Sequence, residues 1–243
     1  MPEIETLARL SELVDQEKNF WDQGTTTVIY RGHGAKSFRL RPKVGRLVAP
    51  RDSATPAKVN EELMLELFRN QSVDRLTTPC LHDWELLAIA QHHGLPTRLL
   101  DWTRSPLVAL YFAVCKECET RNSEGKPERE DAEIIAWRCK KVPLKETREF
   151  LAKHGPFDIR QTVRYVPRIV SPRLRVQKGL FTVHHEPTED YEPPDPVIRI
   201  RIPYEKRKQL KESLFYHGID ESVLFPDLDA LAHHVQWCQT DSY

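Results

Sequence analysis

Apolar residues recur at helical spacing in the first half of the chain and at strand spacing in the second half. Residues 3–20 predict an amphipathic helix ahead of Gly24, with an apolar stripe of Ile4, Leu7, Leu10 and Val14. Residues 25–30 (TTTVIY) predict a strand that runs into a turn at residues 31–34, because β-branched and aromatic residues favour extended backbone. Helices are also expected near residues 58–75, 84–90 and 106–114, the first of which carries Leu63, Leu67 and Phe68.

Strands dominate the second half. Four are predicted, at residues 132–137, 162–166, 179–183 and 197–202. In the last of these, isoleucines and arginines alternate, as expected for a half-buried strand. The charged segment 120–131 predicts a loop, and helices are expected near residues 204–216 and at the end. We therefore expect an α+β fold in which N-terminal helices pack on a mixed or antiparallel β core.

Length and charge narrow the picture further. We interpret residues 1–243 as a single domain, with a mainly helical part at 1–120 and a strand-rich part at 132–243. The 36 basic and 36 acidic residues cancel, so no global field favours nucleic acid or membrane. The segment 160–178 is nevertheless basic and has no acidic residue. Its basic residues are Arg160, Arg164, Arg168, Arg173, Arg175 and Lys178. It predicts a surface for a nucleic-acid or protein acceptor, and the alternative is a solvated strand face.

The amino terminus has no apolar stretch of signal-peptide type, and no run approaches the roughly 20 apolar residues that span a bilayer. We therefore expect a cytoplasmic protein with no membrane contact. Five cysteines fit reduced thiols better than a disulfide framework. Cys115 and Cys118 form a CxxC, but a structural zinc site needs a second close pair of ligands, and we expect no metal.

Residues 90–114 place many polar side chains between two apolar helical segments. The polar residues are Gln91, His92, His93, Thr97, Arg98, Asp101, Trp102 and Thr103. Gly94 and Pro96 end the first helix, and Pro106 begins the second. A charged side chain held so close to buried structure must be paired with an opposite charge or take part in a functional site. One hypothesis is a structural Arg98–Asp101 pair that closes the connection, and the other is a functional site.

Further segments share a family resemblance. Tyr30-Arg31-Gly32, with Leu40-Arg41-Pro42 and Arg46 after it, resembles the signature of the FRG domain family. Residues 91–113 resemble that family's longest motif nearly residue for residue. Residues 177–182 and 224–229 resemble its later blocks, so the resemblance runs from about residue 28 to residue 232.

A weaker resemblance connects the chain to ADP-ribosyltransferases of the arginine–serine–glutamate type. It implies that the helices and the β core form a fold like that of the ADP-ribosyltransferases. Tyr30-Arg31-Gly32 resembles their NAD-contacting strand end, Asp101-Trp102-Thr103 their Ser/Thr strand, and residues 221–226 their late glutamate block. The resemblance implies Arg31, Thr103 and Glu221 as catalytic residues. It implies that Tyr30, Arg31 and Gly32 contact NAD, and we also expect contacts with NAD from His92, Arg98, Asp101 and Gln177.

The late carboxylate block departs from the pattern of this resemblance. An alignment on Pro226 places Ser222 at the glutamate position, which leaves Asp227 and Asp229 as other candidates. Cleavage of the nicotinamide–ribose bond develops oxocarbenium character, which a nearby carboxylate stabilises. A guanidinium on a rigid strand end can hold the pyrophosphate, and glycine at residues 32 and 34 would let the backbone approach the dinucleotide.

These patterns lead to three hypotheses. The first is an NAD-dependent ADP-ribosyltransferase, such as a bacterial toxin or phage-defence effector with an antitoxin or inhibitory partner, that modifies nucleic acid or protein. The second is a non-catalytic nucleotide or nucleic-acid binding module with a transferase-like pocket. The third is a metal-independent nuclease that uses His92, His93 and Arg98. The first requires Arg31, Thr103 and one of the late carboxylates to meet at a single cleft.

Overall fold

The structure is a computed structural model that describes residues 1–16, 28–48, 59–76, 79–116, 119–121, 127–140, 142–145, 148–168 and 172–240. A seven-stranded sheet with the order β6-β7-β8-β2-β1-β5-β9 forms its centre. Its strands are β1 (Val28–His33), β2 (Leu99–Thr103), β5 (Ala132–Arg138), β6 (Leu144–Lys145), β7 (Val163–Tyr165), β8 (Gly179–Val183) and β9 (Val197–Ile202). Neighbouring strands are antiparallel except for the β6–β7 pair at the edge. The predicted α+β class is therefore confirmed.

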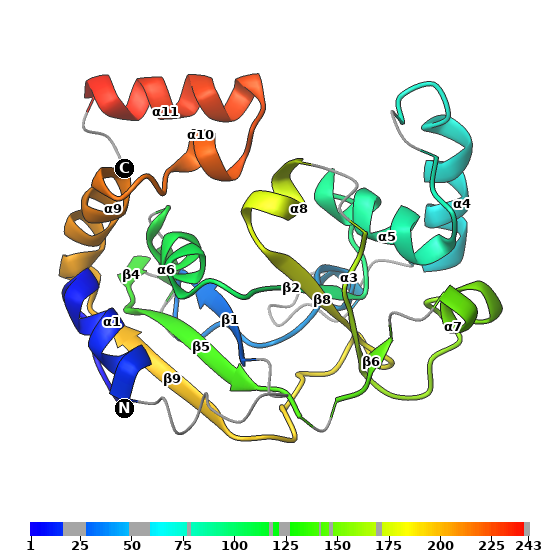
Figure 1. Cartoon of the computed structure of the whole chain (residues 1–243), viewed down its shortest axis with the longest axis horizontal. Helices are drawn as coiled ribbons and strands as arrows, with labels where there is room; N and C mark the ends of the chain where they lie inside the picture. The colour runs from blue at the N-terminus through cyan, green and yellow to red at the C-terminus, as the bar shows by residue number, and fades with distance from the viewer. Residues whose placement is uncertain are drawn as a thin grey trace.

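Helices cover two ends of this sheet. They are α1 (Leu7–Gln16), α3 (Lys43–Val48), α4 (Glu61–Gln71), α5 (Asp83–His92), α6 (Pro106–Val114), α7 (Arg148–Lys153), α8 (Pro172–Val176), η1 (Tyr204–Lys206), α9 (Arg207–Tyr216), α10 (Glu221–Leu224) and α11 (Leu228–Thr240). Helices α1, α9, α10 and α11 gather at one end, and α4, α5 and α7 gather at the other (Figure 1). The predicted amphipathic helix is confirmed over Leu7–Gln16 as α1. Residues 3–6 precede the helix, with Glu3 in a β-bridge to Arg201, and residues 17–20 lie outside the described part.

Three apolar clusters hold the elements together. One joins α1, α6 and α9 to strands β1, β5 and β9, and a second joins α4 and α5 to β7 and β8. The third lies under the centre of the sheet, where the rings of Trp102 and Trp137 are 5.2 Å apart. Strand β2 contributes to two of them, because Leu99 faces the α5 side and Leu100 faces the central cluster.

The sheet forks between β1 and β2. Strand β1 pairs with β5 from Val28 to His33, and β2 pairs with β8 along its whole length. Within the described residues, β1 and β2 share a single register pair, between Tyr30 and Thr103. Beyond that pair, β1 continues to pair with β5 and β2 with β8. The two strands therefore separate, with Arg31 on one of them and Asp101 on the other.

Two predictions near this fork were wrong. Arg31, Gly32 and His33 continue strand β1 instead of forming a turn, because β5 supplies a pairing partner for each of them. The polar segment expected as a connection between two helices contains β2, and of this strand only residues 101–103 were indicated, by the ADP-ribosyltransferase resemblance. Four of its five residues are buried and Asp101 is exposed, so β2 lacks the alternation of a half-buried strand.

Other differences concern surface elements. The predicted loop at 120–131 begins and ends in a short hairpin of β3 (Glu119–Arg121) and β4 (Pro127–Arg129). In α4, Leu63 and Leu67 are 48% and 47% exposed, whereas Leu65 is the residue that reaches the core. Asn60 caps this helix by accepting a hydrogen bond from the Leu63 amide at 3.0 Å, so α4 begins at Glu61, three residues after the predicted start at Lys58.

Candidate functional site

A cleft lies at the fork between β1 and β2. It consists of two adjoining hollows of about 620 and 1040 Å³. Both hollows are lined by Arg31, Arg46, Asp101, Arg173, Leu174, Gln177 and Phe181. The smaller hollow, the polar lobe, adds Lys43, Gln91 and His92, and the larger hollow, the aromatic lobe, adds Tyr30, Phe38 and Phe112. The cleft therefore places charged groups beside a surface of aromatic rings.

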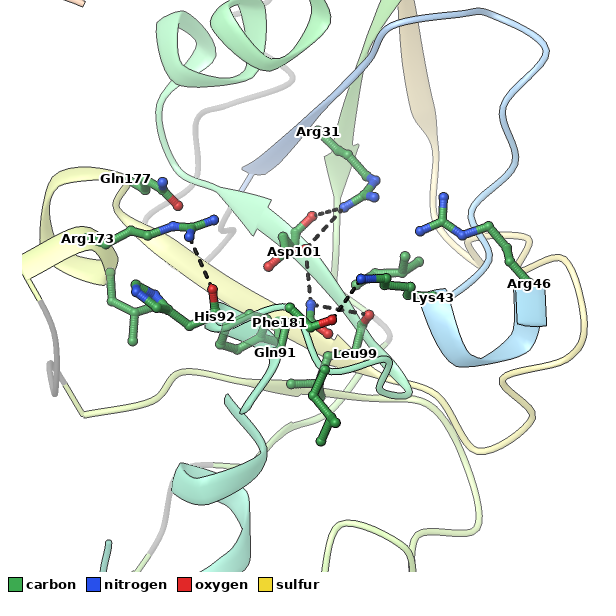
Figure 2. A pocket seen from close by; sticks show the side chains of 14 residues that line it. Arg31, Lys43, Arg46, Gln91, His92, Leu99, Asp101, Arg173, Gln177 and Phe181 are labelled. Atoms are coloured by element: carbon green, nitrogen blue, oxygen red, sulfur yellow. Dashed lines mark hydrogen bonds and ion pairs between the residues drawn. The ribbon is translucent and has the colours of Figure 1, made fainter. Parts of the chain in front are cut away.

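The carboxylate of Asp101 stands in the middle of the polar lobe (Figure 2). Gln91 Nε2 donates a hydrogen bond of 3.0 Å to Asp101 Oδ2. Arg31 approaches from the other strand, with one guanidinium nitrogen 2.5 Å from the Asp101 main-chain oxygen and 4.0 Å from Oδ2. The Asp101 side chain is 67% exposed, so these contacts leave much of the carboxylate open to the cleft.

Four basic side chains surround this carboxylate. Arg31 and Arg46 lie on one side of it and Arg173 on the other (Figure 2). In each arginine, desolvation lowers the pKa of the guanidinium, and the Asp101 charge acts in the opposite direction. Lys43 lies nearby and donates a hydrogen bond of 2.7 Å to the Gly94 carbonyl. The described lining of the polar lobe thus holds four cations and one anion, an arrangement that favours an anionic ligand.

Helix α8 and the chain after α10 hold Arg173 in place. Its guanidinium donates a hydrogen bond of 3.2 Å to the His92 carbonyl and lies 4.3 Å from the centre of the Phe225 ring. Gln177 reaches the same region, where its Nε2 donates a 3.0 Å hydrogen bond to the Leu224 carbonyl. These contacts connect the late sequence block to the cleft wall, but they do so through Phe225 and Leu224 and not through a carboxylate.

Thr103 and Gly32 line the aromatic lobe, and both also have structural roles. The Thr103 hydroxyl donates to the Gln177 carbonyl at 2.6 Å and accepts from the Ser105 amide at 3.0 Å. A Cβ on Gly32 would lie 2.0 Å from the Ala109 carbonyl oxygen of α6. The close approach that requires a glycine here is therefore the crossing of α6 over β1.

The late carboxylates divide between two places. Glu221 lies outside the described cleft lining and lines a separate hollow between α9, α10 and α11, where its Oε1 is 3.3 Å from His233 Nδ1. Asp227 caps α11 through the Ala230 amide at 2.8 Å. Burial lowers the pKa values of His92 and Arg173, and the Asp227 charge acts in the opposite direction. Asp229 is exposed in the first turn of α11. The structure thus brings Arg31 and Thr103 to one cleft without Glu221, because α10 directs that residue toward α11.

Arg98 also lies outside the described cleft lining, and the hypothesis of an Arg98–Asp101 pair was wrong. Its guanidinium makes two hydrogen bonds with the Glu61 carboxylate, at 2.8 and 3.1 Å, and lies 4.9 Å from the Phe157 ring centre. Glu61 belongs to α4, so this pair fastens α4 to the start of β2.

The two neighbouring histidines face different hollows. His92 lines the polar lobe, and burial, followed by the Arg173 charge, lowers its pKa to about 4. His93 lines a different hollow beside α4. Because Arg98 is bound to Glu61, the described structure does not bring these three residues together as the nuclease hypothesis requires.

The basic segment 160–178 does not form one continuous surface of free charge. Arg164 donates to the Val142 carbonyl at 2.9 Å, and Arg168 lies 2.6 Å from the buried Glu85 carboxylate. Arg173 faces the cleft. Arg168 is exposed but paired with Glu85, and the other exposed members are Arg160, Arg175 and Lys178.

The described residues include neither a metal-ligand cluster nor a membrane-spanning helix. In that part of the chain, no three His, Cys, Asp or Glu side chains meet in a group that could hold a metal ion. Cys118, the second cysteine of the CxxC, lies outside it. None of the described helices combines the length and the apolar character that a membrane crossing requires.

Several cleft residues were missed by the sequence reasoning. Arg46 belongs to the quoted FRG signature, and Arg173 belongs to the basic segment, but neither was assigned to the site. Phe181 belongs to the quoted block 177–182 but was not assigned to the site either, and Lys43 belongs to no quoted motif. Phe181 reaches the cleft because β8 pairs with β2. Lys43 reaches it because α3 lies beside the segment before β2, where Lys43 donates a hydrogen bond to the Gly94 carbonyl and the Val44 amide donates one to the Thr97 carbonyl.

Comparison with known proteins gives one match. Residues 26–122 match the family model of the FRG domain, which supports the FRG family for this part of the chain. That segment includes β1, β2, α5 and α6, and therefore both edges of the fork. No curated protein and no solved structure matches the chain.

Proposed function

We propose that the cleft binds NAD and that the protein transfers ADP-ribose from NAD to an acceptor. The observation that carries this proposal is the cluster of Arg31, Arg46 and Arg173 around Asp101, beside a lobe lined by aromatic rings. A dinucleotide has a negatively charged pyrophosphate between two flat rings, and it needs cations and aromatic surfaces at neighbouring positions.

Each group has a role in this proposal. The three arginines hold the pyrophosphate oxygens, and Tyr30, Phe38 or Phe112 contacts a flat ring in the aromatic lobe. As the nicotinamide–ribose bond breaks, nicotinamide leaves with the bonding electron pair as a neutral molecule. The acceptor oxygen or nitrogen then bonds to the ribose carbon and gives up its proton to solvent.

None of Glu221, Asp227 and Asp229 is among the described residues that line the cleft, so the arrangement expected from the sequence is not met. In this proposal Asp101 replaces the late carboxylate as the group that opposes the developing positive charge. It is the acid among the described lining residues of the two lobes, and it is open to the cleft. Electrostatic stabilisation of this kind requires a charge that is held in place before the reaction, and Gln91 holds the Asp101 carboxylate in this way. Glu221 takes no part in this proposal, because it faces another hollow.

The acceptor is a nucleic acid or a protein. Arg175 and Lys178 are exposed and lie close in sequence to Arg173, which faces the cleft. They provide a cationic edge for a polyanionic acceptor. A role as a toxin or phage-defence effector with an inhibitory partner accords with such an activity and belongs to the same proposal.

The test uses labelled NAD with RNA, DNA and lysate protein as separate acceptors. We expect label transfer that is lost in Arg31→Ala and in Asp101→Asn. Glu221→Gln is the matched control, because it removes the same charge from the neighbouring hollow, and it should transfer normally. Absence of NAD binding, cleavage and transfer with every acceptor class would overturn the proposal. Loss in Glu221→Gln but not in Asp101→Asn would contradict the role of Asp101.

A second candidate function is a nucleotide-binding module without turnover. It is favoured by the contacts of Asp101, whose carboxylate already has Gln91 and Arg31 as partners. This alternative predicts saturable NAD or ADP-ribose binding that depends on Arg31, with no nicotinamide released under any condition.

A further inference from the structure

A chain of buried polar groups lies behind Arg31. Arg31 Nε donates a hydrogen bond of 3.1 Å to His33 Nε2 on the same strand. The other ring nitrogen, His33 Nδ1, is 3.2 Å from Glu133 Oε1 on β5. Arg199 on β9 donates to the same carboxylate oxygen at 2.6 Å. His33 and Glu133 are 4% and 2% exposed, so water does not compete for these contacts.

The contacts define the protonation state of His33. The Nε–H of an arginine is always a donor, so His33 Nε2 must present its lone pair to Arg31. The single ring proton is then on Nδ1, where it is donated to Glu133. A second proton on the ring would set two donors against each other. Burial lowers the pKa of His33, and the Arg31 charge lowers it further, whereas the hydrogen bond and charge of Glu133 act against this.

We propose that Glu133 and His33 are positioning residues that orient the Arg31 guanidinium toward the cleft. Arg31 is then held at two points, by His33 at Nε and by the Asp101 main-chain oxygen at a terminal nitrogen. Its remaining N–H groups stay available to an anionic ligand. A side chain that is already fixed loses less conformational freedom when the ligand binds.

The surroundings of His33 distinguish this role from simple sheet stabilisation. Arg199 already neutralises Glu133, so an ion pair between β5 and β9 would be complete without a histidine. His33 extends that pair by one hydrogen bond, and the extension ends on the guanidinium that lines both lobes of the cleft. The Phe38 ring lies 6.1 Å from the His33 ring between centres, and both residues line the aromatic lobe.

The first test measures the proton on His33 in the whole protein and needs no ligand. Nitrogen-15 NMR of the histidine rings at pH 7 should show His33 as neutral, with its proton on Nδ1. The Nε–H resonance of Arg31 should exchange slowly and should shift when His33 is replaced. A proton on Nε2, or a doubly protonated ring at pH 7, would overturn the inference. The result does not depend on whether NAD is the ligand.

The second test rests on the proposed function and measures the affinity for NAD by calorimetry. His33→Ala should weaken binding about tenfold, because the Arg31 guanidinium loses one of its two fixed contacts. His33→Gln offers an amide oxygen at a similar reach and should recover most of that loss. The NAD affinity of Glu133→Gln should lie between those of His33→Ala and His33→Gln, since this variant keeps an acceptor for His33 Nδ1 but removes the charge.

Glu61→Gln is the matched control, since it removes the partner of a partly buried arginine away from the cleft. It should leave NAD affinity unchanged while it lowers stability. Equal binding by wild type and a folded His33→Ala would overturn the positioning role, as would a loss in His33→Gln as large as in His33→Ala. If the wild type does not bind NAD, the proposed function fails and the NMR result alone decides the inference.

Discussion

Arg98 and Asp101 are three residues apart in the sequence, but each belongs to a different charged cluster, and the two clusters differ in charge balance and exposure. Arg98 is matched by a single carboxylate, Glu61, and the two side chains are 12% and 14% exposed. Asp101 faces Arg31, Arg46 and Arg173 and is 67% exposed. The first cluster is balanced and mostly buried, as expected for a structural pair. The second has more positive than negative charge among its described members and opens on a hollow, as expected for an anion site.

Gly32→Ala should have the largest effect, because it disturbs the strand that carries Arg31 to the fork. The new Cβ would lie 2.0 Å from a backbone oxygen of α6, and neither backbone can move without losing its packing. We expect the free energy of unfolding to fall by about 3 kcal/mol, measured by urea denaturation. Gly179→Ala is the control, because its Cβ would meet ordinary contacts beginning at 3.6 Å. Equal stability of the two variants would contradict this account of α6 packing.

Asp101→Asn should separate function from stability. We expect the rate of ADP-ribose transfer to fall about 100-fold, which corresponds to about 2.7 kcal/mol of transition-state stabilisation. Its effect on the free energy of unfolding should be within about 0.5 kcal/mol, because the carboxylate is mostly exposed. Single-turnover kinetics and thermal unfolding of the same preparation measure both quantities. A variant that unfolds easily but reacts normally would reverse the roles assigned to the two clusters.

Glu61→Gln should show the opposite pattern. It leaves the Arg98 guanidinium with a neutral partner near the protein interior, and we expect the free energy of unfolding to fall by about 2 kcal/mol. NAD affinity and transfer should match those of the wild type. A Glu61→Gln protein that is fully stable but does not bind NAD would show that Arg98, and not Arg31, is near the ligand.

The pKa of His184 is affected by the charge of one arginine from each cluster, Arg31 and Arg98, and it makes stability depend on pH. Burial lowers its pKa to about 3, and the charges of Arg31 and Arg98 add to this effect. The unfolded chain binds a proton near pH 6.5 while the folded chain does not, so stability decreases as the pH falls below 7. This group alone should contribute a loss of about 2 kcal/mol between pH 7 and pH 5.

The comparison of two histidine variants isolates that contribution. His184→Gln should reduce the pH dependence of unfolding by about 2 kcal/mol over this range. His185→Gln should retain it, because that side chain is 45% exposed. The same pH dependence in both variants would mean that His184 takes up its proton as easily in the folded protein as in the unfolded chain.

The sequence indicated some elements well and others poorly, for physical reasons. Alternation identified β9, and the run from Pro106 to Val114 identified α6, because each has a strong local pattern. Strand β2 has no alternating pattern, because all of its residues except Asp101 are buried, and only the resemblance at residues 101–103 indicated it. At the site, Arg31 and Thr103 were identified by their motifs, whereas Lys43 reaches the cleft only through tertiary folding. Glu221 was chosen by its place in the chain, and the direction of α10 cannot be deduced from that place.

The proposed function requires that NAD binds in the cleft around Asp101. Calorimetric titration with NAD at moderate ionic strength should give one saturable site in the wild type. Arg31→Ala should bind at least about tenfold more weakly, and Glu61→Gln, the partner variant at the balanced cluster, should bind as the wild type does. No binding by the wild type, or equal binding by Arg31→Ala, would contradict the claim that the cluster around Asp101 is a dinucleotide site.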